Sequence, residues 1–64
     1  MTKFADRLWE ARKEKGFTQE RMAKQMNIHR TTYTKYESGL VQPDLDGFYQ
    51  IVKILEVNPM DLLE

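Results

Sequence analysis

Residues 28–37, with the sequence IHRTTYTKYE, hold the side chains with the clearest potential for chemistry. An arginine can donate two parallel hydrogen bonds to guanine, and a lysine can bind guanine or a phosphate. Threonine offers a hydroxyl together with a methyl group. These groups come from Arg30, Thr31, Thr34 and Lys35. The combination suits hydrogen bonding to a polar, anionic partner.

Catalytic chemistry has little support in the sequence. The chain has one histidine, no cysteine and no glycine-rich phosphate loop, and no nucleophile stands at a recognisable spacing from a base. No Cys/His spacing resembles a zinc site. We therefore expect no enzyme, no metal, no cofactor and no small-molecule ligand.

The period of residues 28–37 decides between strand and helix. As a strand, the segment would mix apolar and polar residues on both faces. As a helix, it has one mainly apolar and aromatic face, made of Ile28, Thr32, Tyr33 and Tyr36. The four polar residues named above then share the opposite face. Packing does not require threonines there, so the segment is predicted to be a helix whose outer face serves contact.

Four further short helices are predicted from caps, stops and apolar stripes. Thr2 can cap the first, which Gly16 ends, and Thr18 can cap the second, which ends at Asn27. The fourth follows an Asp44 cap and contains Gly47, which should cost about 1 kcal/mol relative to alanine. The fifth pairs an Asn58 cap with Pro59.

Inward-facing stripes on these helices predict the core. The residues assigned to it are Phe4, Leu8, Ala11, Met22, Ala23, Met26, Tyr33, Tyr36, Leu45, Phe48, Ile51, Val52 and Leu55.

Charge is unevenly divided along a chain whose net charge is zero. Residues 1–35 carry nine lysines and arginines against four acids, or +5, and residues 36–64 carry one against six, or −5. The split favours a face for a polyanion, although charges that merely coat solvated helices would give the same count. Apolar runs of at most two residues predict a soluble cytoplasmic protein without a membrane segment.

An ordered set of motifs resembles a known family. TQERMAKQMNIHRTTYTKYESG is followed by QPDLDGFYQIVKILEVNPMDLL, with TQ at 18–19, Ala23, E-x-G at Glu37 and Gly39, Pro43, and a closing DLL. Over residues 4–63 this resembles the phage-repressor-like (Cro/CI-type, xenobiotic-response-element) helix-turn-helix domains. The resemblance implies an all-α, five-helix lambda-repressor-like fold as one domain over residues 1–64, with the helix-turn-helix at about 18–38.

The resemblance also implies roles for single residues. In the family the third helix enters the major groove. The base-reading residues implied here are Gln19, Arg30, Thr31, Thr34 and Lys35. Contacts to the DNA backbone are expected for Arg12, Thr18, His29 and Gln42, the last because the loop that contains it lacks the lysines and arginines that the family often has there. Thr18 could instead only cap its helix, and His29, where the family usually has serine or threonine, could simply be a poor cap.

Arg12 and Glu37 match an arginine and a glutamate that often form an ion pair in phage repressors of this family. We expect this pair to be structural first, with Arg12 also able to reach a phosphate. Tyr33 stands where a smaller aliphatic residue is usual, and its hydroxyl needs a partner.

The function implied is that of a sequence-specific, repressor-like transcriptional regulator of prokaryotic or phage origin. Its partner would be double-stranded DNA with a palindromic operator, bound by a homodimer. The expected interface residues are Val57, Pro59, Met60 and Leu62. Because the loop SGLVQPD carries no cation, an alternative stays open. This is a protein-binding module of antitoxin or antirepressor type that has weak DNA affinity and uses Trp9, Leu40 and Val41.

Overall fold

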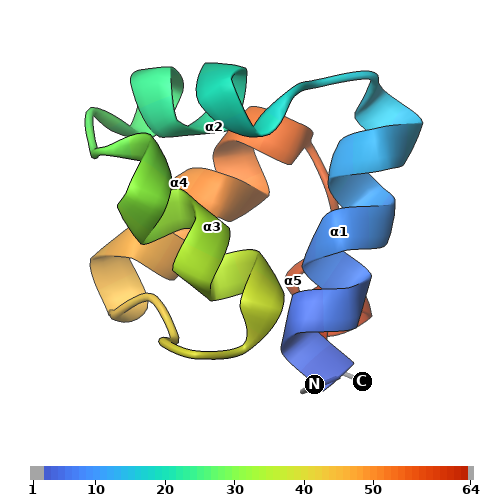
Figure 1. Ribbon diagram of the computed structural model, residues 1–64. Helices are drawn as coiled ribbons and strands as arrows, with labels where there is room; N and C mark the ends of the chain where they lie inside the picture. The colour runs from blue at the N-terminus through green and yellow to red at the C-terminus, as the bar shows by residue number, and fades with distance from the viewer. Residues whose placement is uncertain (1–2, 64) are drawn as a thin grey trace.

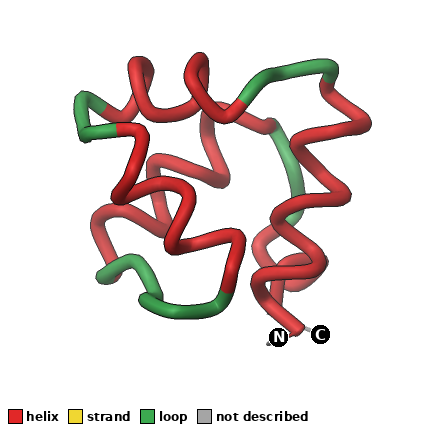
Figure 2. The backbone as a smooth tube through the Cα atoms, in the orientation of Figure 1, coloured by secondary structure: helices red, strands yellow, loops and turns green. Residues whose placement is uncertain are grey.

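A computed structural model describes residues 3–63, which form five α-helices joined by short turns (Figures 1 and 2). The helices are α1 (Lys3–Lys15), α2 (Gln19–Met26), α3 (Arg30–Ser38), α4 (Leu45–Leu55) and α5 (Pro59–Leu63). The described residues contain no strand, so the all-α prediction is confirmed. The predicted Thr2 cap lies outside them. None of these helices is both long and apolar enough to span a bilayer.

The five helices surround one core. α2 and α3 follow each other across a tight turn and pack together, with α4 behind them in Figure 1. α1 runs along the other side and packs against α3, α4 and α5. The core cluster consists of Leu8, Met22, Ala23, Met26, Tyr33, Tyr36, Ile51, Leu55 and Leu62. α3 is therefore held from one side by α1 and from the other by α2.

Burial corrects two expectations about apolar residues. Leu45 was expected in the core, but it is the first residue of α4 and is 84% exposed. Leu62 was expected at a dimer interface, but it is 1% exposed because α5 packs against α1. Val57 also packs partly against the core, whereas Pro59 and Met60 are exposed. Of the predicted interface residues, Pro59 and Met60 are thus exposed, Val57 is half-buried and Leu62 is buried.

Side-chain caps and left-handed residues set the ends of the helices as predicted. Thr18 Oγ1 accepts a hydrogen bond from the Arg21 amide, and Asp44 Oδ1 accepts one from the Gly47 amide. Asn27 ends α2 in the left-handed region with φ 59°, and its amide donates to carbonyl oxygens of α2. The turn between α2 and α3 is therefore closed by backbone geometry that asparagine tolerates well.

Gly47 lies in α4, where glycine is a poor helix former, but its lack of a side chain allows close packing against residues 43 and 44. A Cβ at this position would lie 3.1 Å from Pro43 Cβ and 3.2 Å from Asp44 Oδ1, the oxygen that caps α4. An alanine would gain about 1 kcal/mol of propensity but would crowd this cap. The cost expected from the sequence is thus offset by the close approach that glycine permits.

Candidate nucleic-acid interface

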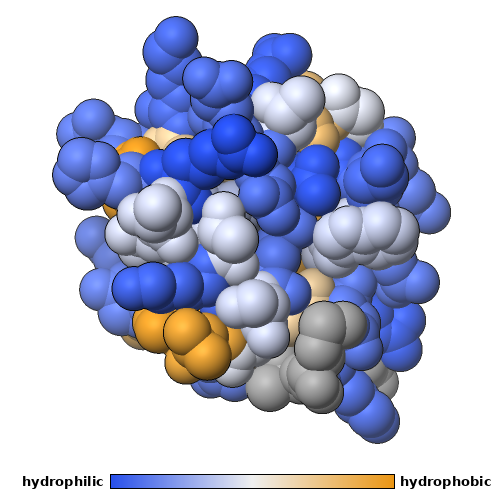
Figure 3. All heavy atoms as spheres, viewed as in Figure 1, coloured by the Kyte–Doolittle hydropathy of each residue, from blue (hydrophilic) through white to orange (hydrophobic). Residues whose placement is uncertain are grey.

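The outer face of α3 carries the four polar residues that the sequence placed there. Arg30, Thr31, Thr34 and Lys35 are all exposed. The opposite face is buried through Tyr33, Tyr36 and Glu37. Figure 3, drawn in the view of Figure 1, shows a mainly hydrophilic surface over α2 and α3, with an apolar patch over the loop that follows α3. The helix thus presents polar groups to solvent while its other face anchors it.

α3 begins without a side-chain cap. His29 occupies the N-cap position and is exposed, but in the described chain its imidazole makes no capping hydrogen bond. The first bonds of α3 run from the Thr32 and Tyr33 amides to the His29 carbonyl oxygen. This geometry agrees with the interpretation of His29 as a poor cap. A contact between its imidazole and DNA stays a prediction.

An ion pair between α1 and α3 holds the candidate interface from behind. Arg12 Nε donates to Glu37 Oε2 at 2.6 Å, and Arg12 Nη2 donates to Glu37 Oε1 at 3.1 Å. The two residues are 8% and 6% exposed, so the pair is buried. A two-point contact of this kind fixes orientation as well as distance. The expected structural pair is present and ties the end of α3 to α1.

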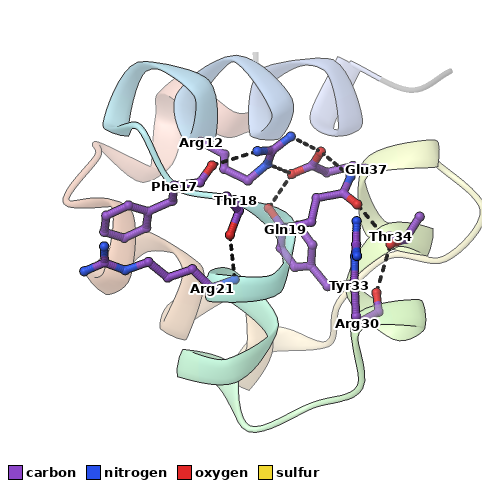
Figure 4. Close-up of polar contacts among 9 residues, drawn as sticks. All are labelled: Arg12, Phe17, Thr18, Gln19, Arg21, Arg30, Tyr33, Thr34 and Glu37. Carbon is purple, nitrogen blue, oxygen red and sulfur yellow. Dashed lines mark hydrogen bonds and ion pairs between the residues drawn. The ribbon is translucent and has the colours of Figure 1, made fainter.

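Arg12 is held within the fold by all three of its nitrogens. Its third nitrogen, Nη1, donates to the Phe17 carbonyl oxygen at 2.7 Å, so all three nitrogens make internal bonds (Figure 4). Because the side chain is also largely buried, little of its surface is free for a phosphate. The structural role expected for Arg12 is therefore present, and its predicted contact with the DNA backbone stays a prediction.

Glu37 receives four hydrogen bonds, two of which the sequence did not suggest. Besides Arg12, Tyr33 Oη donates to Oε2 at 2.5 Å and Gln19 Nε2 donates to Oε1 at 3.1 Å. Tyr33 thus finds the partner that its hydroxyl needs. No buried polar side-chain atom of the described residues is left without a partner. The i, i+4 spacing of Tyr33 and Glu37 was the signal available in the sequence.

These contacts determine the charges in the cluster. Burial alone would raise the pKa of Glu37, but the hydrogen bonds from Arg12, Tyr33 and Gln19 outweigh it and lower the pKa below its ordinary value. Burial, followed by the hydrogen bond to the Glu37 carboxylate, raises the pKa of the Tyr33 hydroxyl far above its ordinary value. Near neutral pH the cluster therefore contains a charged pair and a neutral tyrosine.

The pH dependence of stability should show both shifts. A lowered pKa in the folded state stabilises the fold above the ordinary glutamate value of 4.5, and this stabilisation is lost as pH falls below it. A raised pKa acts in the opposite sense, so the Tyr33 contribution is complete below 10 and falls as pH rises further. The expected profile from urea unfolding is flat between these limits. Tyr33→Phe should reduce the alkaline loss, and an unchanged alkaline limb would contradict the assignment.

Gln19 connects the buried cluster to the exposed face of α3. Its amide nitrogen donates to Glu37, and its carbonyl oxygen accepts from Thr34 Oγ1 at 3.1 Å. Figure 4 shows these contacts as one chain, which runs from Arg12 on α1 to Glu37 on α3, then to Gln19 on α2 and back to Thr34 on α3. Gln19 and Thr34, predicted as separate base-reading residues, therefore contact each other.

The start of α2 carries a cation that was not among the predicted contacts. Arg21 is exposed, and its guanidinium lies over the Phe17 ring at 4.0 Å, close to the Thr18 cap (Figure 4). The exposed amides at a helix N-terminus favour an anion, and a neighbouring arginine adds charge. Its place in the basic half of the chain was the only sequence signal. Gln42 is exposed in the loop after α3.

Two short helices joined through a left-handed turn, the second with an exposed polar face, define a helix-turn-helix domain. The Helix-turn-helix family model matches residues 10–62, and the chain belongs to this family, in its Cro/CI or xenobiotic-response-element type. The family prediction is thereby confirmed. No solved structure matches the chain.

Several curated proteins are similar to this chain, and their names describe transcription regulators. The SPbeta prophage-derived uncharacterized HTH-type transcriptional regulator YonR of Bacillus subtilis (strain 168) is 41% identical over 95% of this chain and 56% of its own. The cryptic phage CTXphi transcriptional repressor RstR of Vibrio cholerae is 38% identical over 88% and 50%. The HTH-type transcriptional activator BcrR of Enterococcus faecalis is 35% identical over 94% and 29%. The chain thus spans at most about half the length of these relatives.

Proposed function

We propose that this chain is a sequence-specific DNA-binding transcriptional regulator that places α3 in the major groove. The observation that carries the proposal is the division of α3, which has one face locked by Tyr33, Tyr36 and Glu37 and the other exposing arginine, lysine and threonines. The similarity to regulators of transcription supports it. A protein acting on a bacterial or phage genome would work in the cytoplasm.

The residues we assign to DNA contact have separate roles. Base reading falls to Arg30, Thr31, Thr34 and Lys35, with Gln19 beside them. Backbone contact falls to Thr18, Arg21, His29 and Gln42. One related protein is named an activator and another a repressor, so we assign no direction of regulation.

A selection of bound sequences from random DNA duplexes, repeated over a series of salt concentrations, tests the function. We expect a palindromic consensus whose binding weakens with salt, by about 0.9 log unit per tenfold rise in salt for each phosphate contacted. No enrichment at low salt would overturn the proposal.

Arg30 and Lys35 should give different changes in the same assay. Arg30→Ala should relax the preference at one base position and cost roughly 1–3 kcal/mol on the selected sequence. Lys35→Ala, if the lysine touches only phosphate, should weaken all sequences alike and reduce the salt slope by about 1. Both side chains are exposed, so circular dichroism should show an unchanged fold. Full retention of base preference in Arg30→Ala would contradict its role.

The homodimer that we propose would use an apolar surface on α4 and α5. This α4–α5 surface consists of Leu45, Phe48, Tyr49, Val52, Pro59 and Leu63, which line two adjoining hollows. Leu45, Tyr49 and Leu63 are largely exposed. Two half-sites about one helical turn apart would then be bound by one dimer, which supports tight binding from two weak contacts.

A charge on the α4–α5 surface should shift the chain toward monomer. Leu45→Glu replaces a side chain that makes little contact within the protein, so the fold should be unaffected. Sedimentation equilibrium should show weaker self-association, and binding to a palindromic site should weaken with it. Leu40→Glu is the matched control, because Leu40 is also well exposed but lies in the loop after α3. Equal effects of the two variants would count against this interface.

The second candidate function is a protein-binding module of antitoxin or antirepressor type. It is favoured by the exposure of Trp9, Leu40 and Val41 and by the lack of a cation in the loop 38–44. Weak DNA binding without sequence enrichment even at low salt, together with retained folding, would favour this candidate over the first.

A further inference from the structure

Glu37 determines how the Gln19 amide is turned. A carboxylate only accepts hydrogen bonds, so the part of Gln19 that faces it must be the NH2 group. Gln19 Nε2 accordingly lies 3.1 Å from Glu37 Oε1. The Gln19 carbonyl oxygen is thereby directed away from Glu37 and accepts from Thr34 (Figure 4). The orientation of the amide follows from the chemistry of a charged group behind it.

The hydrogen of the Thr34 hydroxyl is engaged within the protein. Thr34 Oγ1 lies 3.1 Å from Gln19 Oε1 and 2.9 Å from the Arg30 carbonyl oxygen, and both of these atoms can only accept. One hydroxyl hydrogen serves these two acceptors. The Thr34 side chain is exposed, and it can therefore offer a partner an oxygen lone pair and a methyl group.

We infer that Glu37, acting through Gln19 and together with the Arg30 carbonyl oxygen, presets Thr34 as a hydrogen-bond acceptor toward DNA. This position of α3 therefore selects a base that offers an amino group in the major groove, either adenine through N6 or cytosine through N4. Guanine and thymine present acceptors there and would face the threonine oxygen with a lone pair of their own. The inference rests on the proposed function. It makes Gln19 a positioning residue for Thr34.

A chemical double-mutant cycle tests this polarity. In the selected duplex, the adenine or cytosine facing Thr34 is replaced by an analogue that lacks only the amino group. The parent protein should lose about 3- to 10-fold in affinity, as expected for one neutral hydrogen bond. Thr34→Val keeps the shape without the hydroxyl and should bind both duplexes equally. Thr31→Val is the matched control on the same exposed face, and it should retain the full loss.

Gln19→Met tests the positioning step, because it keeps the length of the side chain but removes the acceptor. It should partly relax the discrimination against guanine at this one position, because the Arg30 carbonyl oxygen remains as an acceptor for the Thr34 hydroxyl, and it should leave the other base preferences unchanged. A selected operator with no coupling between the Thr34 hydroxyl and the amino group would overturn the inference and leave the proposed function intact. Unchanged discrimination in folded Gln19→Met would overturn the positioning role. The absence of any selected sequence would overturn both proposals.

Discussion

Arg12→Ala should lower the free energy of unfolding by roughly 3–5 kcal/mol, because it leaves the Glu37 carboxylate buried without its counter-charge. The Phe17 carbonyl oxygen would lose its donor as well. Small domains commonly have a free energy of unfolding of only about 5–15 kcal/mol, so the expected loss is a large fraction of the total stability. Urea unfolding followed by far-ultraviolet circular dichroism would measure the change.

The exposed ion pair between Lys15 and Glu56 provides the control for Arg12→Ala. Lys15→Ala removes a cation from the same helix, but water already solvates the glutamate, so the change in stability should be small. An unchanged melting temperature for Arg12→Ala, combined with lost DNA binding, would contradict the structural assignment. It would instead support the predicted DNA contact by Arg12.

A triple variant distinguishes the effect of the buried charges on stability from the effect of the volume that their side chains fill. Arg12→Met, Tyr33→Phe and Glu37→Leu together replace the buried polar groups with apolar groups of similar size. Such replacements are often neutral or stabilising, so much of the stability lost in Arg12→Ala should return. The same variant would leave Gln19 without its inner partner, and operator discrimination at the Thr34 position should then fall while the fold survives.

Tyr33→Ala should cost roughly 3–5 kcal/mol of stability, since it would open a cavity where the ring is 0% exposed. The ring also packs edge-on against Tyr36, with centroids 6.0 Å apart, so a neighbouring aromatic contact would be lost. Equilibrium unfolding in urea, at a pH near neutral, would measure the loss.

Tyr33→Phe divides this cost between ring and hydroxyl. It keeps the buried ring and removes only the bond to Glu37, so the expected cost is about 1.5–3 kcal/mol, as for a hydrogen bond to a charged group. A phenylalanine variant as unstable as the alanine variant would mean that the hydroxyl, not the ring, stabilises this site. A variant as stable as the parent would mean that the bond contributes little.

Much of this fold was predictable because its signals are local. Thr18, Asn27 and Asp44 act where capping chemistry predicts, and the 3.6-residue period divides α3 correctly. The errors concern residues whose burial depends on distant partners. Leu45 continues an apolar stripe beyond the point where the core ends, and Leu62 is covered because α1 happens to lie against α5. A helical period cannot specify either relation.

The candidate site divides in the same way. The exposed face of α3 follows from spacing, and the Arg12–Glu37 pair was expected from family resemblance. The contact between Gln19 and Thr34 depends on how α2 and α3 are docked, because these residues lie 15 positions apart. Which of the two residues donates and which accepts depends further on the Glu37 carboxylate, which accepts a hydrogen bond from the Gln19 amide nitrogen. Such a relation appears only when α2 and α3 are docked against each other.

Trp9 is the single tryptophan of the chain, and it lies half-exposed on α1, near the Lys13 ammonium group. Its indole is already partly hydrated in the folded state, so its fluorescence should change only modestly on unfolding. Neither Trp9 nor Lys13 belongs to α3, so emission should also be a poor reporter of DNA binding at α3. Optical assays of this protein should therefore follow helicity for stability and a labelled duplex for binding, leaving tryptophan emission to report on events at the outer side of α1.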